Sequence, residues 1–238
     1  MFYTVLYQPL FNLLIWLYNI LPGADIGFAI IALTVLIKSV LWPFSHVALK
    51  GQRALQEIQP KIEALKVEYK DDKEKLAKAM MELYQKEKVN PFSSCLPLLI
   101  QIPILIALYR VLMDGLQPDK LSALYSFVSN PGSIQANFLG LVDLSKPSII
   151  LALLAGAFQF WQTRMLVAKK PPTAVAKTSG AKDEAMLASM NKSMVTFMPI
   201  MTVVIGVSLP GGLTLYWVAV NLISIAQQYL VFRKKKHV

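Results

Sequence analysis

The sequence contains a single cysteine, Cys95, among its 238 residues. An intrachain disulfide is therefore impossible, and no cluster of cysteines can hold a metal ion. Histidine is almost as scarce: His46 and His237 are the only two, and neither belongs to an HExxH pair. The glycine-rich loop that binds nucleotide phosphates is also missing. We therefore expect no metal, no cofactor and no catalytic residue, and the chain is not predicted to be an enzyme.

Charged residues are rare in the long apolar runs that dominate the sequence. Hydrophobic residues make up 55% of the chain and the mean hydropathy is +0.49, whereas a soluble domain is about 45–50% apolar. About 20 apolar residues cross the roughly 30 Å of hydrocarbon in a bilayer. The runs predict an all-α membrane protein, a bundle of five transmembrane helices at Gly27–Ser45, Leu96–Met113, Pro147–Gln162, Met194–Leu209 and Leu213–Phe232.

Lysine and arginine are absent from Met1 to Ile37 and concentrated elsewhere. Of the 24 basic residues, 20 lie in Lys50–Lys88, Arg164–Lys192 and Arg233–Lys236. Basic residues in alternating loops mark those loops as cytoplasmic, so the net charge of +10 indicates membrane topology and not recognition of a nucleic acid sequence. The C-terminus is predicted to be cytoplasmic. Because Met1–Leu21 resembles neither a signal nor a transit peptide, we expect a bacterial plasma membrane.

The segments outside the spans have distinct patterns. Residues 1–22 are predicted to form an amphipathic helix in the outer interface, because Thr4, Gln8, Asn12 and Asn19 recur near one face; a sixth spanning helix is the alternative. Within the core, residues 23–238, the loop 47–89 has apolar residues at helical spacing and predicts a cytosolic helical hairpin that Pro60 kinks or restarts. It is either a solvated hairpin or a docking arm. Residues 168–185 are predicted to form a flexible linker.

Lys38 lies mid-way along the first predicted span, about 10 Å of helix from its cytosolic end. A lysine facing lipid at that depth costs about 3 kcal/mol on insertion scales, and the five spans contain no Asp or Glu. Lys38 must therefore snorkel to the interface or face water. Many polar residues in the spans favour a hydrated groove that opens to the cytosol, although each alone could bond a neighbouring helix: Thr34, Ser39, Gln101, Gln159, Gln162, Thr202, Asn221, Ser224, Gln227 and Gln228.

Several ordered motifs resemble the YidC family of membrane insertases. They include Thr34-Val35-Leu36-Ile37-Lys38, Gln59-Pro60-Lys61-Ile62, Glu87-Lys88-Val89-Asn90-Pro91, Cys95 to Pro103, Thr196-Phe197-Met198-Pro199 and Gly212-Leu213-Thr214-Leu215-Tyr216-Trp217. The motifs cover nearly the whole chain, which would be a short form without the family's large outer domain. The family commonly has arginine where Lys38 stands, and lysine keeps the charge but not the fork of donors.

The resemblance implies an insertase and chaperone that moves short hydrophilic segments of client proteins across the bilayer and releases client helices into lipid. Thr34 and Lys38 would line the groove, and Tyr216 and Trp217 would contact the client. Nascent membrane proteins, lipid, the ribosome and the Sec translocon are the implied partners of a monomer. Basic residues of the hairpin and the tail would dock these partners: Arg53, Lys61, Lys66, Lys70, Lys73, Lys75, Arg233, Lys234, Lys235 and Lys236.

Two other functions remain open from the residues. In a small transporter or channel, Lys38 would bind an anion during a transport cycle, but the internal repeats common in transporters are not visible. An intramembrane protease is disfavoured because the spans carry no Asp pair and both histidines lie at or beyond span ends.

Overall fold

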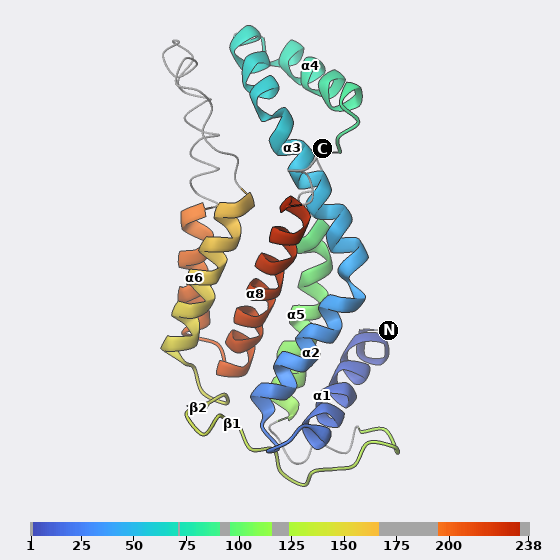
Figure 1. Cartoon of the computed structure of the whole chain (residues 1–238), viewed down its shortest axis with the longest axis vertical. Helices are drawn as coiled ribbons and strands as arrows, with labels where there is room; N and C mark the ends of the chain where they lie inside the picture. Colours follow the sequence, from blue (N-terminus) through green and yellow to red (C-terminus); the bar gives the residue numbers. More distant parts are fainter. Residues whose placement is uncertain (1, 71, 91–95, 116–123, 167–194, 234–238) are drawn as a thin grey trace.

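Helices account for most of the computed structural model, which describes residues 2–70, 72–90, 96–115, 124–166 and 195–233 (Figure 1). A short π-helix, η1 (Tyr3–Tyr7), leads into α1 (Gln8–Ile20). The bundle is built from α2 (Ile26–Val40), α5 (Leu96–Gly115), α6 (Ile149–Leu166), the helix Val195–Gly206 and α8 (Gly211–Arg233). Two further helices, α3 (Trp42–Glu68) and α4 (Lys73–Lys86), extend beyond one end of the bundle.

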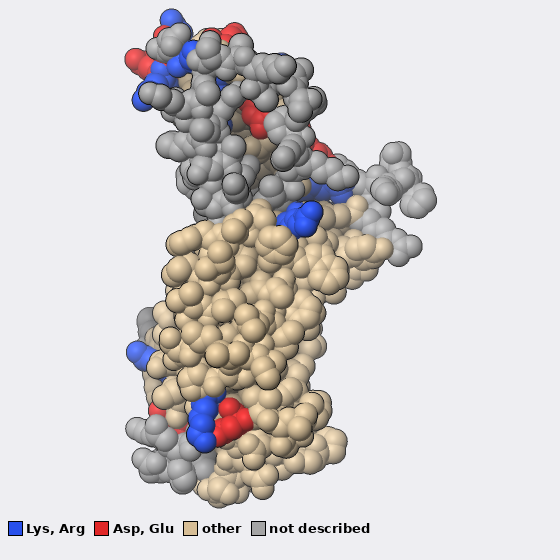
Figure 2. Space-filling view, turned by 90° about the vertical axis from the view of Figure 1, so that its left-hand side faces the viewer, with Lys and Arg blue, Asp and Glu red and all other residues tan. Residues whose placement is uncertain are grey.

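The predicted all-α membrane bundle is confirmed, because each of the five predicted spans overlaps one bundle helix. By length and composition, α6 and α8 can each cross a membrane, and α2 with α3 forms a third candidate if the bent pair is one span. On the face shown in Figure 2, uncharged residues cover most of the middle, and most Lys, Arg, Asp and Glu side chains lie nearer the two ends. The count of five spans stays a prediction.

The first predicted span, Gly27–Ser45, is not one straight helix, although α2 and α3 together can still form a bent span. α2 ends at Val40, and the chain bends by 67° before α3 starts at Trp42. The cause is Pro43, which has no N–H to donate to the carbonyl four residues earlier, that of Ser39. With 15 residues, α2 is about 22 Å long, shorter than the hydrocarbon layer. Lys38 therefore lies in the last turn of α2 and not at the middle of a straight span.

The predicted helical hairpin is confirmed, with α3 and α4 as its two arms (Figure 1). Ile58 and Ile62 are buried, as their helical spacing predicted. Pro60 does not restart the helix, because α3 runs through it as one helix. The Asp72 side chain starts α4 by accepting from the N–H of Lys75, and this bond and the Lys75 ammonium lower the pKa of Asp72.

The N-terminal helix is more deeply buried than an amphipathic surface helix would be. Phe11 and Leu14 lie in the core, but so does Asn12, which was predicted on the polar face and is 2% exposed. The Asn12 carboxamide accepts from the N–H of Tyr125 (2.6 Å) and donates to the carbonyl of Gln8 (2.9 Å). These bonds offset the cost of burying an amide. Polar spacing alone could not reveal them, because Tyr125 lies more than a hundred residues away.

Residues 124–148, here called the loop layer, lie at the end of the bundle opposite the helical hairpin (Figure 1). They contain two short antiparallel strands, β1 (Asn137–Phe138) and β2 (Val142–Asp143), in which Asn137 pairs with Asp143 and Phe138 with Val142. α1 holds the layer by two further hydrogen bonds: Asn19 donates to the carbonyl of Ser129 (2.7 Å), and the Tyr18 hydroxyl accepts from the N–H of Gln135 (3.1 Å).

Candidate functional site

Lys38 reaches from the last turn of α2 to α8. Its Nζ donates a hydrogen bond to Oγ of Ser224 at 3.0 Å. The Lys38 side chain is half-buried, whereas Ser224 is buried. Among the described residues Lys38 forms no ion pair, since the four salt bridges there involve other lysines and Arg53. The positive charge is therefore held between two helices by a neutral hydroxyl group.

Helical spacing explains why Lys38 meets a polar stripe. On α8, Asn221, Ser224 and Gln228 recur at i, i+3 and i+7 and lie on one face. Asn221 donates to the carbonyl of Ala155 in α6 (3.1 Å). Gln228 is 1% exposed, and its Oε1 has no hydrogen-bond partner among the described residues. The buried face of α8 thus carries an unsatisfied acceptor one turn beyond Ser224.

Thr34 is one turn from Lys38 but does not present its hydroxyl to it. Thr34 is 1% exposed and donates to the carbonyl of Ile30 (2.7 Å). Ser39 is exposed and donates to the carbonyl of Val35 (2.7 Å). Both hydroxyls are therefore satisfied within α2, a local bond that Ser and Thr side chains commonly make in helices.

The other predicted groove residues join neighbouring helices in pairs. Gln101 of α5 is hydrogen-bonded to the buried hydroxyl of Tyr216 on α8. Gln159 of α6 accepts from the Thr202 hydroxyl (2.8 Å). Gln162 and Trp217 are half-buried. The structure thus brings Lys38 and Ser224 together and uses most of the remaining polar groups as interhelical contacts; their role in lining a groove stays a prediction.

Comparison with known proteins identifies the family. Residues 16–237 match the model of the family described as "60Kd inner membrane protein". This chain belongs to that family. The resemblance inferred from its motifs is confirmed by relatives named "Membrane protein insertase YidC": 35% identity in Nitrosococcus oceani over 97% of this chain, 37% in Tolumonas auensis over 95%, and 34% in Pelobacter propionicus over 96%. The chain covers only 37%, 36% and 39% of these three relatives.

In this member of the 60Kd inner membrane protein family, Arg53 connects the helical hairpin to α8. Its Nη1 donates to the carbonyl of Phe232 (3.2 Å), and its guanidinium lies over the Phe232 ring, 5.6 Å from the centroid. Arg53 also pairs with Glu57 (3.1 Å). Nearby, Gln227 donates to the carbonyl of Trp42 at the α2–α3 bend (3.5 Å). These contacts join the end of α8 to the bend and the first half of α3.

Sequence reasoning missed this connection, which we call the Arg53 contact. Arg53 was predicted to dock a partner, but its guanidinium is already engaged within the chain. Two of the remaining hairpin lysines form ion pairs: Lys61 with Glu87 (2.6 Å) and Lys75 with Asp72 (2.9 Å). Lys66 is half-buried, and Lys70 and Lys73 are exposed. Arg233 ends α8. Lys234, Lys235, Lys236 and the predicted linker 168–185 lie outside the described residues.

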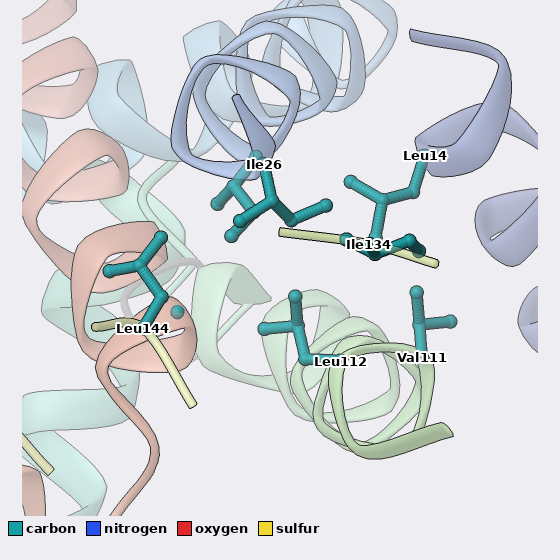
Figure 3. Close-up of a pocket in the computed structure, with 8 residues that line it drawn as sticks. Leu14, Ile26, Val111, Leu112, Ile134 and Leu144 are labelled. Carbon is teal, nitrogen blue, oxygen red and sulfur yellow. The ribbon is translucent and has the colours of Figure 1, made fainter. Parts of the chain in front are cut away.

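The cavity drawn in Figure 3 is a packing gap, and neither Lys38 nor Ser224 lines it. Its lining is apolar and comes from α1, α2, α5, α8 and the loop layer: Leu14, Ile26, Ile30, Val111, Leu112, Ile134, Leu144 and Gly212. Leu112 and Val111 rise from α5 towards Leu14 and Ile134, and Leu144 closes one side. Without a polar lining group the gap offers nothing to bind a hydrophilic segment, so it is not a second polar site.

Proposed function

We propose that this chain is a membrane protein insertase and chaperone. It moves short hydrophilic segments of client proteins across the bilayer and releases their helices into lipid, through a hydrated, positively charged groove that opens to the cytosol and to lipid. The observation that carries the proposal is the position of Lys38, a charged group between α2 and α8 whose described partner is a neutral hydroxyl. Its family membership and the names of its relatives support the same activity.

The Lys38–Ser224 pair suits transient binding of an acidic client segment. The Lys38 ammonium bonds a neutral hydroxyl in Ser224, whereas a client Asp or Glu adds the attraction between opposite charges. A client carboxylate therefore displaces the Ser224 hydroxyl. When the segment leaves, Ser224 takes the ammonium back and limits the cost of a buried unpaired charge. The exchange lowers the barrier for a polar segment without any nucleotide.

The partners and location belong to the same proposal. The clients are nascent membrane proteins, and the exposed lysines of the helical hairpin face the ribosome or the Sec translocon. The chain acts as a monomer in the bacterial inner membrane with its C-terminus in the cytoplasm. What supports this orientation is the concentration of basic residues in the hairpin and at the end of α8, as the positive-inside rule requires.

The test is insertion of a single-span client with a short acidic outer segment into liposomes that contain the purified chain. Protease protection of that segment measures insertion. We expect Lys38→Ala to reduce protection severely, Lys38→Arg to retain it and Lys38→Glu to abolish it, because only the charge-preserving variant still attracts a carboxylate. Lys146→Ala is the control: it removes an exposed lysine paired with Asp143 at the opposite end of the bundle and should insert the client like wild type.

Two results would contradict the proposal in different ways. If the Lys38→Glu variant inserted the client normally, the electrostatic mechanism would be wrong. If wild type gave no more protection than empty liposomes but conducted small anions in a flux assay, the chain would be a transporter and not an insertase.

A further inference from the structure

The turn between β1 and β2 has a backbone conformation that its sequence does not favour. Leu139 and Gly140 both have positive φ, at 54° and 70°, and the N–H of Leu141 donates to the carbonyl of Phe138 (2.9 Å). Three residues separate the paired Phe138 and Val142. A turn whose two central residues both have positive φ prefers Asn-Gly or Gly-Gly there. A leucine in the left-handed region costs roughly 1–2 kcal/mol, so the turn keeps an apolar side chain at the expense of its own stability.

Leu139 and Leu141, here called the tip of the turn, have large apolar side chains that are exposed. Leu141 is 85% exposed and Leu139 is 57% exposed. Leu141 therefore gains little from contacts within the described part of the chain, where a polar residue would be better solvated. Backbone strain combined with apolar exposure indicates that the side chains contact something outside the chain.

The tip is fixed rigidly to the start of α2. Asp25 makes two bonds with its carboxylate, accepting from the N–H of Gly27 (2.7 Å) and from the N–H of Leu139 (2.7 Å). The Phe138 ring lies against Gly27, so closely that a Cβ at residue 27 would overlap the ring. The same ring meets Phe28 edge-on, with centroids 5.5 Å apart. The turn therefore cannot move without moving the first turn of α2.

This attachment places the tip beside the exposed apolar side of α2. Phe28 is 43% exposed, and the exposed apolar side of α2 goes on through Val35 and Leu36. Figure 1 places β1 and β2 at the end of the bundle where α2 and α6 begin. The charged pair Asp143–Lys146 follows within five residues of Leu141, as expected where apolar surface meets water.

We propose that Leu139 and Leu141 form a lipid anchor that inserts into the headgroup–acyl boundary of the leaflet on this side. The anchor sets the depth of α2 in the bilayer, and thereby the depth of Lys38, which lies on the same straight helix. Its occupant is lipid, because the tip extends the apolar surface of α2 and is bordered by a water-exposed ion pair. This role does not depend on which activity the Lys38 site supports.

The first experiment measures where the tip lies. A Cys95→Ser background allows an environment-sensitive fluorophore to be attached at Leu141→Cys, with the whole chain in lipid nanodiscs. We expect emission shifted to shorter wavelength, strong quenching by lipids with a nitroxide near the headgroup, and weak quenching by aqueous iodide. A label at Lys146→Cys, whose side chain is 78% exposed, is the matched control and should show the reverse. Equal iodide quenching at both positions would overturn the anchor.

The second experiment separates anchoring from folding. Leu139→Asn with Leu141→Asn removes the apolar tip but suits the turn, because asparagine tolerates positive φ. Thermal unfolding should occur at the same or a higher temperature than in wild type. A fluorophore at Val35→Cys is quenched by lipids that carry the nitroxide either near the headgroup or deep in the acyl chain. The ratio of these two quenching values should differ between the double variant and the protein with Leu139 and Leu141, because α2 shifts along the membrane normal. An unchanged ratio would show that the tip does not set the depth of α2.

Discussion

The Arg53 contact makes a sharp prediction about the helical hairpin. Replacing Arg53 by alanine removes two interactions with the last turn of α8. One is the hydrogen bond from the guanidinium to the carbonyl of Phe232, and the other is the cation–π contact with the Phe232 ring. A cation at a helix C-terminus contributes about 0.3–1 kcal/mol, and a cation–π contact at a partly exposed site adds about 0.5–1 kcal/mol. The side chain is 27% exposed and its pair with Glu57 is on the surface, so that pair adds little.

The total of about 1–2 kcal/mol corresponds to a factor of about 5–30 in the population of a detached hairpin. Spin labels at Val67→Cys on α3 and Tyr229→Cys on α8, both exposed positions, report the distance between the two helices in a Cys95→Ser background. We expect a narrow distance distribution in wild type. Arg53→Ala should broaden it and add a second population.

A control variant distinguishes this contact from general loosening of the hairpin. Lys61→Ala removes the Lys61–Glu87 pair, which joins α3 to the end of α4 but does not touch α8. It should leave the α3–α8 distribution as narrow as in wild type. If Arg53→Ala also left the distribution unchanged, the α2–α3 bend alone would hold the hairpin and our reasoning about Arg53 would be refuted.

Three further substitutions test the packing, each followed by thermal unfolding of the purified protein. Lys88→Gly should stabilise the end of α4 by about 1 kcal/mol, because Lys88 has a φ of 53° where glycine is favoured; no gain would mean that the lysine is not strained. Gly27→Ala should destabilise by about 1–3 kcal/mol, since Phe138 must move away; an unchanged midpoint would show that the ring is loosely held. Asn12→Ala should cost about 1–3 kcal/mol by leaving the N–H of Tyr125 unpaired, and a smaller loss would mean that water replaces the amide.

Much of the fold could be predicted from local patterns in the sequence. Apolar runs located all five bundle helices, because a helix in lipid must satisfy its backbone internally and hide few charges. The spacing of Ile58 and Ile62 located the buried side of the helical hairpin. Lys38 was singled out as the charge within a span that must snorkel or face water, and Ser224 and Gln228 were named among the polar residues that could line a groove.

Sequence reasoning placed the end of α2 wrongly and did not find two contacts that no local pattern contains. The end of α2 was placed too late because the length of the apolar run hid the effect of Pro43, although the proline itself was a local signal. Asn12 was assigned to a polar surface because its partner, the N–H of Tyr125, comes from a distant loop. Arg53 was assigned to docking because its carbonyl partner belongs to the end of α8.

The sequence by itself therefore determined which segments are helical, which side of each helix is apolar and which charge needs a partner, since hydrophobic periodicity and charge are properties of neighbouring residues. Tertiary structure alone decided that Lys38 meets Ser224, that Gln101 meets Tyr216, and that the hairpin is tied to α8. These pairings depend on how the helices are rotated and bent against one another. That geometry is set by the packing of the whole bundle, which no single segment encodes.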